Sequence, residues 1–408
     1  MSASLTSTLK EPSIFVEKLY INGAWVSSNS GQSFEVSNPA DDVIIGTCPE
    51  SNVRSMSGRQ RGRIITKIFN LIVEAKEDIG KIITAENGKA KADAEGEALF
   101  AASFFEWFGE EASRIYGDVI PHSNPTFRTR INKEPVGVCG LITVWNFTLT
   151  MGARKISAAL AAGCTIVLKS DGLTPFSSNA LAILSERAGL PKGVFNVVTS
   201  LKNTPEIDLA LCQSKLVKKI SFTGSTRVGK LLMKQSSDTL KKLSLELGGN
   251  APLIVFDDAD LETAVASTLI SKFKVTGQTC VCATRIYVQE GIYDRYTERL
   301  VEEVGKFKFG DGKDFSVTHG PLTTGTAKVE EHIKDAVSKG YKILLGGNAL
   351  PKLGRNFHEL TIPGDTDDAA RILAKRHSAL SRRCSNLSPS QRLSRGPTNR
   401  KLDLLPMS

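Results

Sequence analysis

Two cysteines stand one residue apart in the stretch KVTGQTCVCATRIYV, residues 274 to 288. A zinc site is improbable here, because no second cysteine pair follows and the five histidines of the chain form no cluster. No histidine is placed as an obvious base for a cysteine–histidine dyad. Buried packing is the commonest role of a free cysteine. A polar turn would instead expose the Cys280 thiol, and a helix start would favour its thiolate, so the residues alone leave both roles open.

Two polar residues close apolar, strand-like runs. Glu246 ends LSLE in the segment LELGG, where it is either an acid that points into solvent or a half-buried general base whose pKa is raised by desolvation. Asn146, in TVWNFT, either caps the helix that follows or donates a hydrogen bond to a developing oxyanion. Each residue type suits acyl-transfer chemistry, and each also has an ordinary structural explanation.

The stretch FTGSTRVG, residues 222 to 229, follows a predicted strand and opens a predicted helix. Gly224 and Gly229 would let the backbone approach a phosphate, which the free N–H groups of the helix start could hold. A Gly-Ser-Thr turn at a helix start is more often only a cap. Its place within a βαβ series favours the phosphate.

The elements that must position these residues can be predicted from periodicity. An Asn-Gly turn between alternating runs predicts a hairpin over residues 14 to 26. Apolar spacing of three and four predicts two long amphipathic helices, over residues 64 to 90 and 98 to 117. Residues 127 to 145 are predicted to form a hairpin that enters a buried strand. Five strands alternating with four helices then continue to residue 249, which predicts an α/β fold with a mainly parallel sheet and ligands at the carboxyl ends of its strands.

Composition limits the partners that the chain can have. The chain has 408 residues, of which 41% are hydrophobic, and it shows neither a signal peptide pattern nor an apolar run long enough to span a bilayer. We expect a cytoplasmic protein with reduced thiols and no membrane partner. The net charge is +9, but residues 371 to 408 hold nine Lys or Arg against one acid. The basic excess therefore belongs to a Ser-rich and Arg-rich tail, which is predicted to be disordered and which lacks aromatic residues for nucleic-acid stacking.

Taken in order, Trp145-Asn146-Phe147, Lys169, FTGST, LELGG and GQTCVCATR resemble an aldehyde dehydrogenase from about residue 14 to residue 364. The resemblance implies a Rossmann-type cofactor domain over residues 1 to 248, with an oligomerisation hairpin near 127 to 140, and a second α/β catalytic domain over 249 to 364. It implies that Cys280 is the nucleophile, that Asn146 and the Cys280 N–H hold the oxyanion, and that Glu246 activates the hydrolytic water.

The resemblance also implies NAD or NADP as the cofactor. The positions that match family contact residues are Trp145, Asn146, Lys169, Gly172, Gly224, Ser225, Gly229 and Leu247. A family Glu that binds the adenosine ribose and repels a 2′-phosphate is replaced here by Gly172. That replacement slightly favours NADP over NAD. Asp171, directly before it, adds an acid nearby.

Within the family, CVC and Arg154 are similar to succinate-semialdehyde dehydrogenases, in which two basic residues clamp the substrate carboxylate. Arg154 matches one of them, and Lys274 stands where the other is Arg, which keeps the charge but loses the bidentate fork. The expected substrate is thus a semialdehyde acid, with oxidation to the dicarboxylic acid as in 4-aminobutyrate degradation. Cys282 is either packing or a resolving thiol that could reversibly block Cys280.

Three departures from the family pattern lead to further expectations. Val144 and Thr148 replace two prolines that flank the oxyanion donor. A family helix near residues 48 to 63 is shortened. The family's Glu-x-Phe-Gly-Pro segment and the family elements after it are missing, which predicts a C-terminally truncated or frame-shifted copy with an incomplete catalytic domain. Homo-oligomers, usual in the family, are then doubtful, and the alternative to an active enzyme is a catalytically silent homologue that acts as an interaction subunit.

Overall fold

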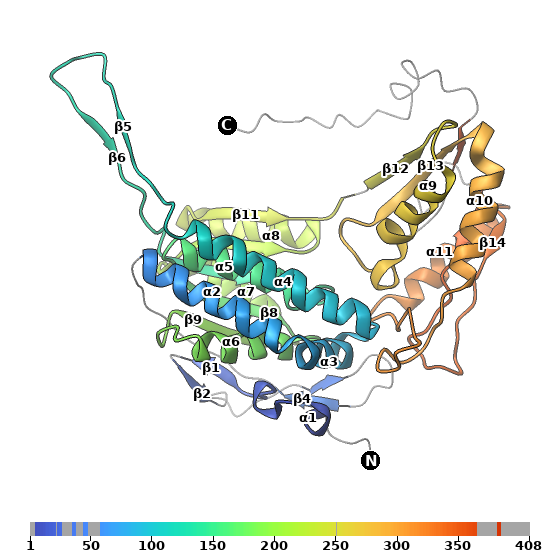
Figure 1. Ribbon diagram of the computed structural model, residues 1–408, viewed down its shortest axis with the longest axis horizontal. Helices are drawn as coiled ribbons and strands as arrows, with labels where there is room; N and C mark the ends of the chain where they lie inside the picture. Colours follow the sequence, from blue (N-terminus) through green and yellow to red (C-terminus); the bar gives the residue numbers. More distant parts are fainter. Residues whose placement is uncertain are drawn as a thin grey trace.

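The computed structural model describes residues 5–21, 23–26, 35–37, 44–47, 58–249, 251–364 and 382–384. Figure 1 shows two α/β bodies side by side and a long hairpin that projects from the larger one. The larger body holds the elements up to β11, and the smaller body begins with β12. The predicted mixed α/β architecture is confirmed.

The larger body is built on a seven-stranded sheet of order β11-β10-β7-β8-β9-β1-β2. The five strands from β7 to β11 are parallel, as the predicted βαβ series requires, and β1 adds to β9 in the antiparallel sense. The predicted N-terminal hairpin is confirmed as β1 and β2. The strands are β1 Leu19–Ile21, β2 Ala24–Val26, β7 Val138–Ile142, β8 Thr165–Asp171, β9 Phe195–Ser200, β10 Val217–Thr223 and β11 Lys242–Glu246.

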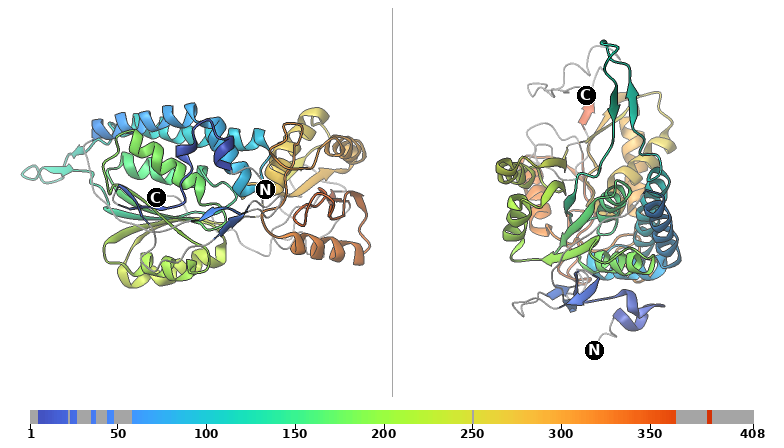
Figure 2. Two further views of the ribbon diagram at one scale, coloured as in Figure 1. Left: turned by 90° about the horizontal axis from the view of Figure 1, so that it is seen from below. Right: turned by 90° about the vertical axis from the view of Figure 1, so that its left-hand side faces the viewer.

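Helices cover both faces of this sheet (Figure 2). The main core packs α2 to α6 on one face, and a smaller core packs α7 and α8 on the other. The first long helix predicted from the sequence is instead two helices, because the backbone of Ala75 leaves the helical conformation at φ −90° and ψ 8°. The helices are α2 Gly58–Glu74, α3 Lys76–Asn87, α4 Lys91–Glu111, α5 Thr150–Ala161, α6 Phe176–Arg187, α7 Thr204–Gln213 and α8 Thr226–Ser236.

The projecting hairpin consists of β5 Asp118–Ile120 and β6 Thr129–Ile131 (Figure 1). The bounds predicted for it, 127 to 140, are wrong. The Pro-Val-Gly break at residues 135 to 137 is not the hairpin turn but the entry to β7, and the turn lies before residue 129. Only the predicted buried strand at the end of this segment is in place.

The smaller body has its own core around the fully buried Tyr296. Its parallel sheet has the order β12-β13-β16, and a two-stranded sheet pairs β14 with β15. The elements are β12 Ala251–Val255, α9 Leu261–Thr268, the π-helix η3 Leu269–Phe273, the 3₁₀ turn η4 Lys274–Gly277, β13 Ala283–Gln289, α10 Glu290–Gly305, α11 Thr326–Ser338, β14 Ile343–Leu345, β15 Ile362–Pro363 and β16 Arg382–Cys384.

The strand β16 corrects part of the tail prediction. Residues Arg382–Cys384 lie within the segment expected to be disordered, yet they pair in parallel with β13. Main-chain hydrogen bonds to a sheet edge require no particular side chains, so an irregular sequence can supply such a strand. The other residues from 365 to 408, and those from 48 to 57 near the predicted shortened helix, lie outside the described residues.

The remaining described elements are α1 Leu5–Thr8, η1 Pro12–Ile14, β3 Glu35–Ser37, β4 Ile44–Thr47 and η2 Ser237–Thr239. Among the helices that the structure describes, none is both long and apolar enough to cross a bilayer.

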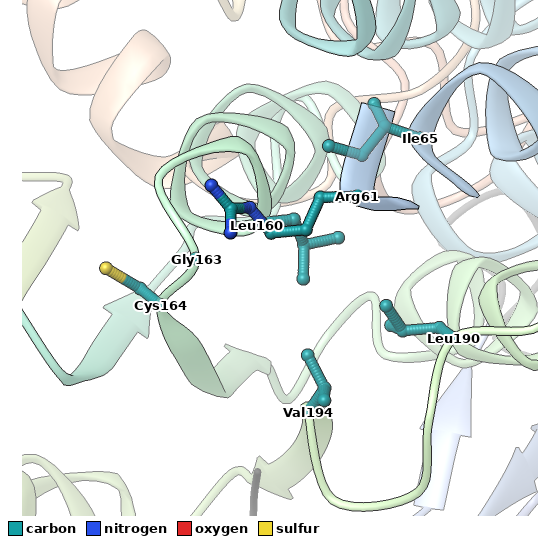
Figure 3. A pocket seen from close by; sticks show the side chains of 7 residues that line it. All are labelled: Arg61, Ile65, Leu160, Gly163, Cys164, Leu190 and Val194. Carbon is teal, nitrogen blue, oxygen red and sulfur yellow. The ribbon is translucent and has the colours of Figure 1, made fainter. Parts of the chain in front are cut away.

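A small cavity of about 10 Å³ lies at the amino-terminal edge of the large sheet, just before β8 (Figure 3). Arg61 packs over Gly163 there, and its Nε donates to the carbonyl of Ala161 at the last turn of α5 at 2.9 Å. This arrangement caps a helix and fills a corner of the core. Ligand sites in such sheets lie at the opposite, carboxyl edge.

Candidate active site

A cavity of about 440 Å³ lies at the carboxyl ends of β10 and β11 and takes walls from both bodies. It brings together three residues that are far apart in the sequence and for which catalytic roles are expected, Asn146, Glu246 and Cys280. Five of the other predicted site residues also line it, namely Trp145, Gly224, Ser225, Leu247 and Cys282. Lys169, Gly172, Gly229, Arg154 and Lys274 do not.

The loop that carries Cys280 joins η4 to β13. Cys280 lies in a turn and is partly exposed, with the Cys282 N–H donating to the Thr279 carbonyl at 3.4 Å. The strand β13 follows the thiol, so no helix start lies directly after it to favour the thiolate. Just upstream, Val275 and Thr276 both adopt the left-handed region, at φ 55° and 53°. β-Branched residues rarely do so, and such strain is typical of functional loops.

Asn146 reaches across to this loop. Its Nδ2 donates to the main-chain carbonyl of Gln278 at 2.8 Å. It does not cap the following helix, whose first turn begins at Leu149 without a side-chain cap. One of the two amide N–H groups therefore fixes the Asn146 side chain, which lines the cavity, to a residue two positions from Cys280.

A buried ion pair holds the segment that carries Asn146. The Glu97 carboxylate accepts from the Leu149 and Thr150 N–H groups at 3.0 and 3.2 Å, and it pairs with the Lys89 ammonium. A carboxylate at this position satisfies the free amides at the start of α5. The same ammonium lies 4.2 Å from the ring centre of Phe147. These contacts fix the main chain of the segment from Asn146 to Thr150.

Glu246 is the last residue of β11. It is exposed, which agrees with the first of the two alternatives, an acid that points into solvent, and not with a half-buried carboxylate. Its main-chain carbonyl accepts from the Gly224 N–H at 3.0 Å, which ties the end of β11 to the Gly-Ser-Thr turn. An exposed carboxylate at the mouth of the cavity can exchange protons directly with water.

The Gly-Ser-Thr turn has the features of a phosphate cradle. The Ser225 hydroxyl caps α8 by accepting from the Val228 N–H at 3.3 Å, which confirms the capping interpretation. A Cβ on Gly229 would stand 2.5 Å from the Leu247 side chain, which would have to move to admit a larger residue there. The hydroxyl of Thr223 is buried at the cavity and has no hydrogen-bond partner among the described residues. An anion at the start of α8 would fit this donor set.

Lys169, Asp171 and Gly172 lie at the end of β8, outside the main cavity. Lys169 is buried, and burial raises the pKa of the neighbouring Asp171 carboxyl, which accepts from the Leu173 N–H at 3.0 Å. A Cβ on Gly172 would meet the Ser200 carbonyl oxygen at 2.5 Å. A glutamate could therefore not stand at position 172 without a shift of this turn.

The two basic residues expected to bind a substrate carboxylate are separate from the cavity wall. The Arg154 guanidinium lies over the ring of Phe104, at 4.8 Å from its centre. Lys274 is exposed at the start of η4. Cys282 is buried, and its thiol donates to the Lys272 carbonyl at 3.0 Å, which agrees with packing. Among the described residues, no group of three or more His, Cys, Asp or Glu could hold a metal ion.

The sequence interpretation missed Lys155 on α5. Its Nζ donates to the Ser221 hydroxyl at 3.2 Å, and burial lowers its pKa to about 8, with the Arg154 charge acting in the same direction and Glu246 opposing. The available signal was a lysine directly before the run of small and apolar residues ISAALAA, 156 to 162. Lys328 of α11, which lines the cavity, was also missed.

Comparison with known proteins gives the family. The aldehyde dehydrogenase family profile matches residues 25–376. The chain is 48% identical over 370 residues to succinate-semialdehyde dehydrogenase [NADP(+)] of Saccharomyces cerevisiae, covering 86% of this chain and 74% of that protein. It is 46% identical over 383 residues to glutarate-semialdehyde dehydrogenase of Pseudomonas aeruginosa, covering 89% and 79%.

A solved structure agrees with these sequence relatives. Succinate-semialdehyde dehydrogenase from Burkholderia pseudomallei superposes with a TM-score of 0.89 at 42% identity, covering 93% of this chain and 83% of that one. The match extends over both bodies and the cavity between them. This chain belongs to the aldehyde dehydrogenase family.

Proposed function

We propose that this chain oxidises a semialdehyde acid to the dicarboxylic acid with NADP⁺, and that its main substrate is succinate semialdehyde. The observation that carries the proposal is that a thiol, an amide and a carboxylate from three distant segments line one cavity, with the amide held 2.8 Å from the nucleophile loop. Thiol, amide and carboxylate are the groups that covalent oxidation of an aldehyde requires.

In the first step the Cys280 thiolate attacks the aldehyde carbon, and the carbonyl oxygen becomes an alkoxide. The Asn146 Nδ2 and the main-chain N–H of Cys280 would donate to this oxyanion. Because the Gln278 carbonyl and the ion pair of Glu97 already hold this segment, the donor needs little reorganisation when charge develops.

The dinucleotide would be held by the start of α8 and by the turn after β8. Ser225, Gly224 and Thr223 would bind phosphate oxygens, and Lys169 would bind the adenosine ribose end. When bound, the oxidised nicotinamide supplies the acceptor for the hydride that leaves the substrate carbon. Oxidation leaves an acyl group on Cys280 as a thioester.

Hydrolysis completes the reaction. Glu246 would take a proton from a water molecule as that water attacks the thioester carbon, which releases the carboxylic acid and restores the Cys280 thiolate. Because Glu246 is exposed, its proton can pass to bulk solvent before the next turnover.

Two observations support NADP over NAD. Gly172 lies so close to the Ser200 carbonyl that a glutamate, which would repel a 2′-phosphate, could stand there only after a shift of the turn. The Lys169 side chain lies on the same strand end and would pair with that phosphate. The S. cerevisiae relative is also named as an NADP(+) enzyme.

The substrate is proposed from two relatives, whose names specify aldehydes with a carboxylate at the far end. Arg154 lies against Phe104 outside the cavity wall, so its side chain would have to turn to reach that carboxylate. Arg154→Ala is expected to lower kcat/KM for succinate semialdehyde about 100-fold, which is the usual effect of losing a charged hydrogen-bond partner. For butanal, which has no carboxylate, kcat/KM should change less than about threefold. Steady-state kinetics on both aldehydes, with Arg154→Lys as the charge-matched control, measure the difference. Equal losses on the two aldehydes would refute the carboxylate contact.

We further propose that the chain works as a homo-oligomer in a reducing compartment such as the cytoplasm. The β5–β6 hairpin exposes Val119 and Phe127 at 76% and 60% far from either core, which suits a partner copy. The described cysteines are free, as the Cys280 chemistry needs. Light scattering should show a multimer for the unmodified chain and a smaller species for Val119→Lys. A monomeric unmodified chain would contradict the proposal.

A further inference from the structure

A second cavity, of about 70 Å³, lies behind the nucleophile loop. It shares Thr276, Gly277, Leu322 and Val329 with the active-site cavity, so η4, directly before the loop that carries Cys280, forms part of the wall of each. Its other walls come from η3, α11 and the segment before β15. Lys272 of η3 lines this second cavity only.

Lys272 is a buried cation without a counter-charge among the described residues. The residue is 2% exposed, and its Nζ has no hydrogen-bond partner in the described part of the chain. Burial lowers its pKa to about 8, and the Cys282 thiol opposes this shift. At neutral pH the side chain is therefore mainly an ammonium, and a buried ion of this kind is unfavourable until it is paired.

The neighbouring titratable groups do not neutralise Lys272. The Glu359 carboxylate accepts from the N–H and Nδ2 of Asn348, at 3.1 and 2.9 Å. His358 and His332 are buried in the wall, and the His358 Nδ1 lies 3.0 Å from the Glu359 carbonyl. Neither imidazole is an acid that could balance an ammonium, and no described carboxylate forms an ion pair with Lys272.

We propose that this cavity binds a short aliphatic carboxylate, with the Lys272 ammonium as its counter-ion. The volume is several times the roughly 10 to 15 Å³ that one water needs, which suits a ligand of about five non-hydrogen atoms. The wall is otherwise largely apolar, as an alkyl stem requires; it includes Phe273, Leu322, Val329, Ile333 and Leu360.

Propionate is the probe, and propionamide is its neutral match in shape. Calorimetric titration of the full chain at pH 7 and constant ionic strength should show saturable binding of propionate. Propionamide should bind at least tenfold more weakly. Lys272→Met should weaken propionate binding at least tenfold. Lys334→Met, which removes a lysine next to Ile333 of the wall, should leave it unchanged. Equal binding of propionate and propionamide, or an unchanged affinity in Lys272→Met, would overturn the proposal.

A pH series keeps the test valid if Lys272→Met does not fold. Because propionate pairs with the ammonium, its affinity in the unmodified chain should be level below about pH 7 and should fall about tenfold per pH unit above about pH 8.5. A pH-independent affinity from about pH 6.5 to 9.5 would contradict the ion pair. The site does not depend on the proposed oxidation, because Cys280→Ser should retain it, so the two proposals fail separately.

Discussion

Cys280→Ser is expected to lower the rate of semialdehyde oxidation by about 10,000-fold or more, which is the scale on which enzymes lose activity when a covalent nucleophile is removed. No histidine is among the described residues that line the cavity, so none would activate a serine hydroxyl at this turn. A thiol forms its anion far more readily. NADPH formation, followed by absorbance with succinate semialdehyde in excess, measures the loss.

Cys212→Ala is the matched control, because this thiol is buried in α7 away from the cavity. It should keep a rate close to that of the unmodified chain. The Cys280→Ser variant should also bind NADP⁺ as before, since the residue is not part of the proposed phosphate cradle. A Cys280→Ser variant with more than about one hundredth of the normal rate would exclude the thiol as the nucleophile.

Asn146→Ala should lower kcat by about 100-fold to 1000-fold, as removal of a single oxyanion donor does in acyl-transfer enzymes. The structural reason is that Asn146 is fixed against the Gln278 carbonyl and so presents its second N–H without reorganisation. KM for the aldehyde should change little, because the oxyanion exists only after attack. Stopped-flow measurement of the first turnover isolates this step.

Asn146→Asp tests whether the amide acts as a hydrogen-bond donor or only fills space beside the loop. The carboxylate has the same shape but cannot donate, and its charge opposes the oxyanion, so the loss should be at least as large as for alanine. Thermal unfolding midpoints of both variants report any loosening of the loop. A loss in kcat below about tenfold in Asn146→Asp would show that the amide only supports the fold.

The larger body could be predicted well from the sequence because each of its strands and helices carries its own period. Alternating and three-to-four spacing set the order from β7 to β11, and chain connectivity then makes the sheet parallel. Turn residues were less informative. The Pro-Val-Gly break at 135 to 137 resembled a hairpin turn but begins a buried strand, since local signals do not say which segment will pair.

For the candidate site, it was easier to predict which residues meet than to predict how exposed each one is and what surrounds it. Cys280, Asn146 and Glu246 do meet at one cavity. The two alternatives for Glu246, exposed or half-buried, could not be separated from the sequence, because the exposure of a strand end depends on what packs beside it. Lys155 and Lys272 had no signal strong enough to stand out, since burial of a lysine is a property of the packed structure alone. Cys282 is buried against the Lys272 carbonyl. Its alternative role as a resolving thiol remains a prediction.

The most direct test of the proposed chemistry is the mass of the enzyme during turnover. Glu246→Gln should oxidise the substrate but hydrolyse the thioester slowly, so an acid quench after mixing with NADP⁺ and succinate semialdehyde should trap an acyl group. Peptide mass spectrometry should place that acyl group, a succinyl mass of about 100 Da on general chemical grounds, on Cys280. An enzyme that forms NADPH while Cys280 carries no acyl group would contradict the covalent mechanism.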